Sequence, residues 1–267
     1  MSPSEVQRIG SRDNPLLKTL RTLAKDNSAY RQHGQVWLEG DHLFRAAITR
    51  GWRVAHAVFA QSMWERCAAD PAFALERVSV LPDALFAGIS PLAADQEMGF
   101  VLDLPKAPPI DPDIATVVLD RVQDAGNVGS ILRSAAAFGF AQIVALRGTA
   151  GLWSPKVVRA GMGAHFALRL CESVSVADAL ALRLPFIATS SHQGDWLHQC
   201  EGVLDLPWPC AWLLGHEGQG VQSALLEAAP RCVRIVQPGG EESLNVAAAA
   251  AVCLHASAAG RLRRTGC

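Results

Sequence analysis

Short, mostly apolar runs, each followed by a loop rich in glycine and polar residues, recur through the second half of this chain of 267 residues. A run of four or five apolar residues without alternation is typical of a strand buried on both faces of a parallel sheet. Segments suited to helices separate these runs, which indicates an α/β domain with helices on both faces of the sheet. The predicted strands are 115–119, 142–146, 186–189, 211–214 and 233–236, and the predicted helices are 128–138, 225–228 and 245–259.

The first hundred residues predict a second, smaller α/β unit. Asn14 and Pro15 are suited to the N-cap and the first turn of a helix over 15–25. Four prolines between residues 104 and 113 can continue neither a helix nor a central strand, so they indicate a linker. The predicted division is therefore a domain over 1–104, a linker over 105–113 and a domain over 114–267. In the first domain, strands are predicted at 35–39, 54–60, 78–81 and 99–102, and a helix at 42–49.

The composition excludes several classes of protein. Half of the residues are hydrophobic and 18% are charged, which excludes an intrinsically disordered chain. The longest apolar run, Val246–Leu254, is too short to span a bilayer. The N-terminal segment lacks the apolar core of a secretory signal. We therefore expect a cytoplasmic protein with no membrane partner.

The cysteines and histidines do not predict a metal site. The seven cysteines are odd in number and form no C-x-x-C pair, which is typical of free thiols in a reducing cytosol. His192, His198 and Cys200 lie close together in the sequence, but their spacing matches no zinc-binding pattern. We expect no bound metal.

The charges are unevenly distributed along the chain. The formal net charge is −1, but residues 1–60 hold nine Lys or Arg against five Asp or Glu, a net charge of +4. Such a basic end could face a polyanion. The alternative is an ordinary solvated helix, which charge alone slightly favours.

Three loops at the ends of predicted strands carry the candidate chemistry. In the first, 120–129, Asn127 lies at the start of the next helix, and Arg133 follows six residues later, near the same helix end. A helix N-terminus beside an arginine suits a phosphate or carboxylate. The alternative is that Asn127 is only an N-cap and Arg133 only a surface cation.

The second loop, 214–220, contains Gly215, Gly218 and Gly220, which permit positive φ angles and close approach of the backbone to a ligand. Glu217 lies in the middle and could accept a hydrogen bond from a hydroxyl or from a backbone N–H. The loop is neither a P-loop nor a G-x-G-x-x-G fingerprint. The alternative is a tight turn from strand to helix without a ligand.

The third loop, 235–245, leads into the alanine-rich helix. Ser243 or Asn245 can cap this helix, and a capped core helix without function is the alternative. In parallel α/β sheets, ligands bind beyond the carboxyl ends of the strands. Because three such loops follow separate strands, we expect them to share one site.

These loops resemble a known family. In order, they are similar to the three motifs of the SpoU (TrmH) family: Asn127-x-Gly129-x-x-x-Arg133, Gly215-x-Glu217-x-x-Gly220, and Ile235 with Ser243-Leu244-Asn245-Val246. The segments 9–18 and 37–40 also resemble the N-terminal RNA-binding domain of that family. The resemblance extends over nearly the whole chain.

The resemblance implies an RNA ribose 2′-O-methyltransferase that uses S-adenosylmethionine. It implies a catalytic domain of the SPOUT class, an α/β sheet whose C-terminal segment forms a deep trefoil knot. It further implies an N-terminal domain similar to a small α/β ribosomal protein, and a homodimer with its site near the subunit interface. Because of that N-terminal domain, ribosomal RNA is favoured over transfer RNA as the substrate. A transfer RNA methyltransferase and a non-catalytic RNA-binding protein of the same fold are the alternatives.

The resemblance also assigns residues to the site. The implied catalytic residues are Asn127, Arg133, Glu217, Ser243 and Asn245. The implied cofactor-binding residues are Thr189, Gly215, Glu217, Gly220, Ile235, Gln237, Leu244 and Asn245. The implied RNA contacts are Arg12, Asn14, Lys18 and Arg21.

Two roles are open for Arg133. The usual family assignment makes it the proton acceptor, helped by an RNA phosphate. A guanidinium normally stays protonated, however, so Arg133 could instead position the nucleotide and stabilise the developing oxyanion.

One position departs from the family, and one other enzyme class competes with it. The third motif of the family usually begins Ile-Pro, whereas here Val236 follows Ile235 and the proline is Pro238. A dinucleotide-dependent oxidoreductase is the competing class, but the strand 115–119 is not followed by G-x-G-x-x-G.

Overall fold

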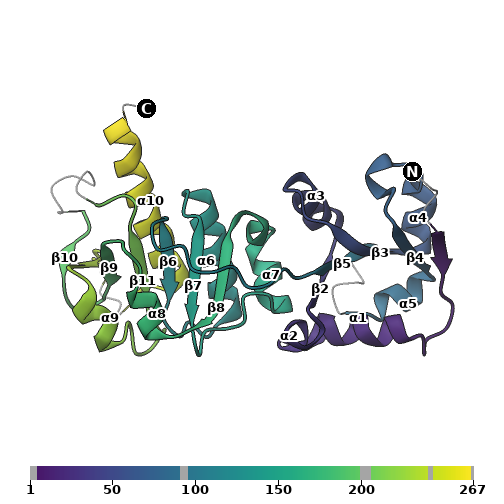
Figure 1. Ribbon diagram of the computed structural model, residues 1–267, viewed down its shortest axis with the longest axis horizontal. Helices are drawn as coiled ribbons and strands as arrows, with labels where there is room; N and C mark the ends of the chain where they lie inside the picture. Colours follow the sequence, from purple (N-terminus) through teal and green to yellow (C-terminus); the bar gives the residue numbers. More distant parts are fainter. Residues whose placement is uncertain (1–4, 91–95, 199–205, 240–242, 266–267) are drawn as a thin grey trace. The chain divides into compact units, whose positions relative to one another are not determined.

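The computed structural model describes residues 5–90, 96–198, 206–239 and 243–265. The chain forms two compact units (Figure 1). Unit 1 comprises the chain up to Lys106 together with Trp153–Val158, and unit 2 comprises Ala107–Leu152 and the chain from Arg159 onward. None of the described helices has the length and apolar character that a membrane crossing requires.

Unit 1 is built on a mixed sheet of five strands in the order β1-β4-β3-β5-β2. β1, β4 and β3 run parallel, whereas β5 is antiparallel to both β3 and β2. The strands are β1 (Glu5–Arg8), β2 (Gln35–Glu39), β3 (Val54–Ala60), β4 (Arg77–Leu81) and β5 (Met98–Asp103). The helices are α1 (Pro15–Lys25), α2 (Ala29–His33), α3 (Asp41–Thr49), α4 (Gln61–Cys67) and α5 (Asp83–Ala87), with a 3-10 turn at Pro71–Phe73.

The helix α1 forms as its sequence predicts. Asn14 is its N-cap, with the Oδ1 atom accepting from the Leu16 backbone N–H at 2.9 Å. Its buried leucines pack in a core with side chains from the sheet, among them Trp37 and Val58. This apolar face is what holds α1 on the sheet.

Unit 2 is built on seven parallel strands in the order β10-β12-β9-β11-β6-β7-β8. The predicted parallel α/β sheet is thus confirmed. β6, β7 and β11 are buried at every position, because helices cover both faces of the sheet. The strands are β6 (Thr116–Leu119), β7 (Gln142–Leu146), β8 (Arg169–Val174), β9 (Phe186–Thr189), β10 (Asp195–Trp196), β11 (Ala211–Leu214) and β12 (Arg231–Arg234).

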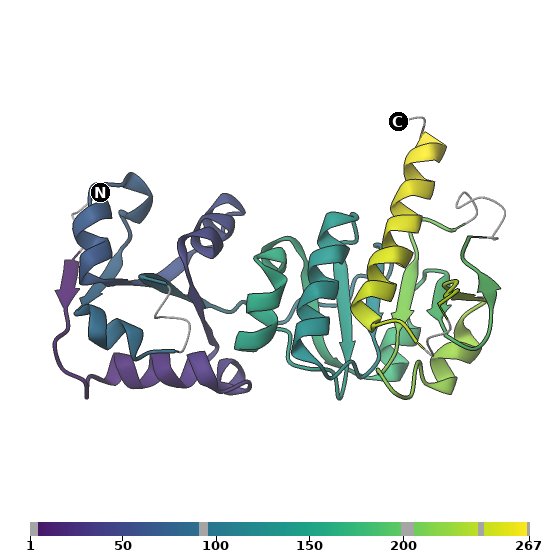
Figure 2. The same ribbon diagram turned by 180° about the vertical axis from the view of Figure 1, so that it is seen from behind.

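Two pairs of helices cover the sheet of unit 2. Figure 2 shows α6 (Ala125–Ala137) and α10 (Val246–Thr265) side by side on one face. On the other face, seen in Figure 1, lie α8 (Val176–Leu180) and α9 (Ser223–Ala228). The other helical segments that the structure describes are α7 (Pro155–Gly161), whose residues 155–158 belong to unit 1, and a 3-10 turn at Ala164–Ala167 in unit 2.

Several predicted boundaries were wrong. α6 begins at Ala125 rather than at residue 128, because Asp124 caps it. β12 lies two residues earlier than predicted, since the arginines at its ends hid the strand in the hydrophobicity pattern. α10 continues to Thr265, beyond the predicted end at residue 259.

The proline-rich segment predicted as a linker is fastened to unit 2 over residues 109–113. The buried Gln142 side chain donates to the Asp111 carbonyl and accepts from the Asp111 N–H, both at 2.9 Å. Arg169 donates to the Pro109 carbonyl, and Arg183 pairs with the Asp113 carboxylate. This part of the segment is therefore ordered against the sheet.

The five cysteines that the structure describes are free thiols, and the other two, Cys200 and Cys267, lie outside the described residues. Of the residues considered for a metal spacing, only His192 and His198 are described. Among the described residues, no group of three or more His, Cys, Asp or Glu is arranged to hold a metal ion.

Candidate active site

The topology of unit 2 indicates that a ligand site is to be expected between β6 and β11. These strands are parallel neighbours, and the chain leaves them in opposite directions: from β6 to β7 on one side, and from β11 to β12 on the other. In open α/β sheets, ligands bind at such a switch point, beyond the carboxyl ends of the strands. The first predicted loop follows β6 and the second follows β11, so both lie at this point.

The N-cap of α6 is Asp124, not Asn127. The Asp124 Oδ1 atom accepts from the Asn127 backbone N–H at 2.7 Å. Asn127 therefore lies in the first turn of the helix, and its own side chain is not used for capping. The alternative in which Asn127 is only an N-cap is wrong.

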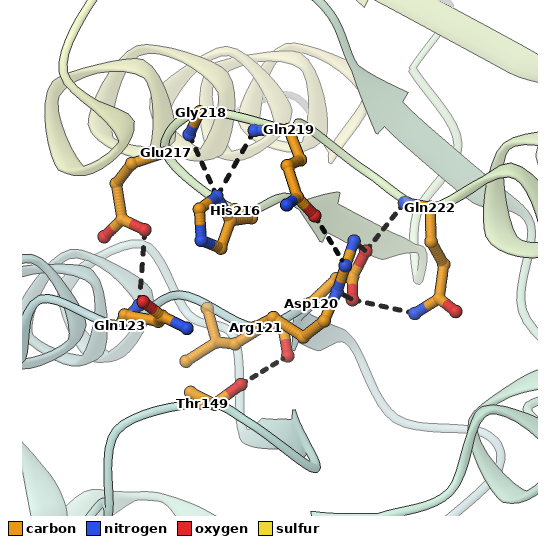
Figure 3. Close-up of polar contacts among 10 residues, drawn as sticks. Asp120, Arg121, Gln123, Thr149, His216, Glu217, Gly218, Gln219 and Gln222 are labelled. Atoms are coloured by element: carbon orange, nitrogen blue, oxygen red, sulfur yellow. Dashed lines mark hydrogen bonds and ion pairs between the residues drawn. The ribbon is translucent and has the colours of Figure 1, made fainter.

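Glu217 joins the second loop to the start of α6. Its Oε1 atom accepts from the Asn127 side-chain amide and from the Asp124 backbone N–H, each at 3.2 Å. Its Oε2 atom accepts from the Gln123 backbone N–H at 3.2 Å (Figure 3). The carboxylate thus lies where the positive end of the helix dipole favours negative charge.

Asn245 joins the third loop to the same group. Its Nδ2 atom donates to the Asn127 Oδ1 atom at 2.9 Å. Its Oδ1 atom accepts from the N–H groups of Ala247 and Ala248, which makes Asn245 the cap of α10. Asn127, Glu217 and Asn245 therefore form one hydrogen-bonded chain, and we call it the three-loop network. Loops that are far apart in the sequence converge here, as predicted.

The three-loop network keeps Glu217 ionised. Partial burial raises the pKa of Glu217, but hydrogen bonds from its own backbone N–H, from Asn127 and from the backbone of Asp124 and Gln123 together lower the pKa below its ordinary value. A carboxylate that accepts several hydrogen bonds is stabilised in its charged form. Glu217 is thus a fixed acceptor and is poorly suited to take up a proton at neutral pH.

Arg133 lies on the exposed side of α6, six residues after Asn127. Within the described part of the chain, its guanidinium forms no hydrogen bond or ion pair. Its five N–H donors are therefore available to a ligand such as a phosphate.

The second loop owes its shape to glycine. Gly220 has a φ of +68°, and the backbones of His216 and Gly220 exchange hydrogen bonds of 3.1 and 2.8 Å. A Cβ atom on Gly215 would lie 2.1 Å from the Gly220 carbonyl carbon. The close approach that we predicted for a ligand is therefore, at Gly215, an approach of the turn to itself. The His216 ring closes the tip, because Nδ1 accepts from the N–H groups of Gly218 and Gln219 (Figure 3).

The other residues predicted for cofactor binding or catalysis lie in the segments that follow β9 and β12, and no hydrogen bond within the described part of the chain joins them to the three-loop network. The Thr189 hydroxyl donates to the Leu213 carbonyl at 3.0 Å, between the ends of β9 and β11. Ile235 and Gln237 are half-buried in the segment that follows β12. Ser243 and Leu244 are exposed just before α10.

Asp120 and Arg121 were missed as site residues. Asp120 is fully buried at the end of β6 and binds Gln222 through both the backbone N–H and the side chain of that residue. Arg121 pairs with Asp120 and reaches Gln219 in the second loop. An acidic residue directly after a buried strand was the signal available in the sequence.

The predicted RNA contacts lie in unit 1, and they differ in exposure and in their hydrogen bonds within the protein. Arg12 and Lys18 are exposed. Arg21 is half-buried and donates to the carbonyls of Arg12 and Gly88, so it holds the chain around α1. Asn14 caps α1, as described above.

Comparisons with known proteins converge on one family. A sequence model described as the SpoU rRNA methylase family matches residues 115–255. An uncharacterised tRNA/rRNA methyltransferase of Synechocystis sp. is 32% identical, over 94% of this chain and 93% of its own length. The 23S rRNA (guanosine(2553)-2′-O)-methyltransferase of Bacillus subtilis is 28% identical, over 82% of this chain and 86% of its own.

A solved structure is similar over almost the whole chain. It is the SpoU methyltransferase AviRb from Streptomyces viridochromogenes in complex with AdoMet, with a TM-score of 0.77 and 25% sequence identity. The match covers 94% of this chain and 100% of that one. The similarity therefore includes both compact units.

Proposed function

The chain belongs to the SpoU rRNA methylase family, and from this premise we propose that it transfers a methyl group from S-adenosylmethionine to a ribose 2′-hydroxyl of ribosomal RNA. The three-loop network carries the proposal. It lies at the switch point of the sheet and contains an asparagine, a glutamate and an asparagine at the positions of the family motifs. The 2′-O-methylating relative from Bacillus subtilis and the AdoMet-bound neighbour support this chemistry.

The residues of the second and third loops fit the proposed methyl donor. The edge of the second loop is exposed at Gly218 and Gly220, so backbone groups are accessible there. Two large apolar side chains of the third loop are also exposed, Val236 at 48% and Leu244 at 40%. Exposed apolar side chains and accessible backbone groups are the features that suit a flat base such as adenine. When bound, S-adenosylmethionine supplies an electrophilic methyl group on a sulfonium centre.

The residues of this chain would act on the other reactant, the ribose. The hydroxyl must lose its proton as it attacks, and that proton would pass to solvent water or to an RNA phosphate. We assign Arg133 to binding the nucleotide and stabilising the developing oxyanion, since its guanidinium is exposed and has no partner within the described part of the chain. Asn127 would hold the ribose side of the site, while Glu217 and Asn245 keep Asn127 in place. Ser243 is proposed to order the third loop around the bound ligands.

Unit 1 is proposed to capture RNA through Arg12 and Lys18, with contacts to phosphate.

We also propose the finer features that the family implies. These are a trefoil knot in the catalytic domain, a ribosomal-protein-like fold for residues 1–104, a boundary within 105–113, and a cytoplasmic location. A homodimer is proposed through the exposed face of α6 and α10.

The direct test is methyl transfer from radiolabelled S-adenosylmethionine to RNA. We expect label in ribosomal RNA at 2′-O-methylated nucleotides and little in purified transfer RNA. Label in transfer RNA alone would favour the transfer RNA enzyme. RNA binding without label would favour the non-catalytic alternative. Calorimetric titration with S-adenosylhomocysteine and with NAD(H) separates the proposal from the oxidoreductase, because only the expected ligand should release heat.

A further inference from the structure

The carboxylate of Asp120 is the most completely enclosed charge near the candidate site. Its side chain is fully buried at the end of β6. The Oδ2 atom accepts from the Gln222 backbone N–H, and Oδ1 accepts from the Gln222 side-chain amide, both at 2.7 Å (Figure 3). Arg121 adds Nε at 2.8 Å to Oδ1 and Nη2 at 3.3 Å to Oδ2. These four bonds fill the acceptor capacity of a carboxylate, which compensates for its burial.

Arg121 adopts a backbone conformation that arginine rarely takes. Its φ is +59°, in the left-handed region that favours glycine. Such a conformation persists only where the surroundings over-determine it. Here it lets the guanidinium fold back onto the neighbouring Asp120 and donate through Nη1 to the Gln219 Oε1 atom at 2.9 Å. Gly148, also at positive φ, leaves room for the side chain, since a Cβ there would lie 3.3 Å from the Arg121 Cγ atom.

These contacts fix the C-terminal half of the second loop, around residues 219–222. Gln219 and Gln222 stand on either side of Gly220, and both are tied to the end of β6. Gly215 packs directly against the backbone of Gly220, so the position of one sets the position of the other. Glu217 holds the tip of the same loop on α6. The loop is therefore anchored at two separate points, and Asp120 is the buried centre of one of them.

We infer that Asp120, acting through Arg121 and Gln222, is a positioning residue. It holds the backbone of the second loop in the conformation that binds the methyl donor. This inference rests on the proposed function, in which the exposed edge of the second loop at Gly218 and Gly220 contacts the donor. Asp120 is buried and is not placed to touch RNA or the reacting hydroxyl. Its loss should therefore weaken donor binding while leaving the chemical step at saturating donor largely intact.

The test is an Asp120→Asn variant, which keeps the size of the side chain but replaces an acceptor oxygen by an amide. We expect the Kd of S-adenosylhomocysteine and the KM of S-adenosylmethionine to rise at least tenfold, equivalent to about 1.4 kcal/mol. The kcat at saturating donor and the KM of RNA should change by less than about threefold, a split that general destabilisation would not produce. Asp113→Asn is the matched control, because Asp113 pairs with Arg183 near the opposite end of β6. It should bind the donor like the wild type.

A second variant keeps the inference testable if Asp120→Asn does not fold. Gln219→Ala removes only the exposed bond to Arg121, and should weaken binding of S-adenosylhomocysteine about threefold without changing the melting temperature. Donor affinity equal to wild type in Gln219→Ala, or a lower kcat with unchanged KM in Asp120→Asn, would overturn the inference. Failure of the wild-type protein to bind S-adenosylhomocysteine would instead refute the proposed function, so the two failures can be told apart.

Discussion

At the scale of single residues, Arg133 stands apart from the rest of the site. The side chains of Asn127, Glu217 and Asn245 hold one another, whereas Arg133 has no partner in the described part of the chain. We expect Arg133→Ala to lower kcat by about 10² to 10³, the usual effect of removing a donor from an oxyanion. Binding of S-adenosylhomocysteine should stay unchanged. Single-turnover methyl transfer and calorimetry measure the two quantities.

A conservative variant at the same position sharpens this prediction. A lysine side chain there would keep the charge but lose the planar fork of donors, so Arg133→Lys should recover little of the lost rate. A rate near that of the wild type in Arg133→Ala would contradict the role assigned to this residue.

The basic residues of unit 1 allow a paired comparison. Lys18 is exposed, whereas Arg21 also holds two backbone carbonyls. Lys18→Ala should weaken RNA binding similarly for all sequences and reduce the salt dependence, the slope of log K against log salt, by about 1. Arg21→Ala should in addition lower the melting temperature. Filter binding at several salt concentrations checks the first effect, and an unchanged salt slope would argue against a phosphate contact at Lys18.

Residue types were easier to predict than residue roles. The motif residues Asn127, Glu217 and Asn245 were predicted from the sequence, and they do converge. The N-cap of α6 could not be predicted. Both Asp124 and Asn127 have side chains suited to capping, and only the backbone position decides between them. Arg121 was missed because its positive φ contradicts its intrinsic preference, and only tertiary contacts impose it.

At the scale of elements, α10 and the site are joined through one side chain. Asn245 caps the helix with its oxygen and holds Asn127 with its nitrogen. Asn245→Ala should lose both functions, with a stability cost of about 1 kcal/mol and a lower kcat. Asn245→Asp keeps the capping oxygen but loses the donor, so it should recover stability and not turnover. Chemical denaturation and methyl-transfer assays give the two readouts, and equal turnover in Asn245→Asp and wild type would contradict a role for the bond to Asn127.

The elements that could be predicted are those whose pattern is continuous. β6, β7, β9 and β11 are mostly apolar and lie close to their predicted positions. β1 was missed because its four residues, EVQR, contain a single apolar residue and it forms by pairing with β4. The fastening of residues 109–113 to the sheet could not be predicted either, since it depends on Gln142, which lies 31 residues from Asp111.

At the scale of the whole molecule, each unit contains a buried histidine. His56 bonds to Ser79 in unit 1, and His165 bonds to the Leu152 carbonyl in unit 2. Burial lowers the pKa of each from its ordinary value of 6.5 to about 4. Below pH 6.5 the unfolded chain takes up protons that the folded chain does not, so stability is lost as the pH falls from 6.5 towards 4.

The expected loss is up to about 1.4 kcal/mol per pH unit for each histidine within that interval. Urea unfolding at pH 7 and pH 5 measures it. His56→Gln removes one titrating group, so its stability should depend less steeply on pH than that of the wild type. An identical pH dependence in the two proteins would show that His56 does not contribute.

The exposed face of α10 bears on how two molecules would associate. Val252 is 43% exposed and Leu262 is 53% exposed, and with Ala248 and His255 they follow the spacing of one helical stripe. Phe138, the C-cap residue of α6, packs against His255, with ring centroids 5.5 Å apart, so the stripe continues to the end of the neighbouring helix. Exposed apolar stripes of this kind are typical of surfaces that pair. A second copy of the chain could cover the stripe by a symmetric, self-complementary contact, because small alanine side chains let helices approach closely.

We therefore expect light scattering on a sizing column to give twice the monomer mass of 28.5 kDa for the wild type. Val252→Glu should shift the mass to that of the monomer, because an unpaired carboxylate would be buried in the interface. Val6→Glu is the matched control, since Val6 is an exposed valine (37%) at the edge strand β1 of unit 1. It should leave the mass unchanged. If Val252→Glu stays dimeric, the pairing surface must lie elsewhere than on α6 and α10.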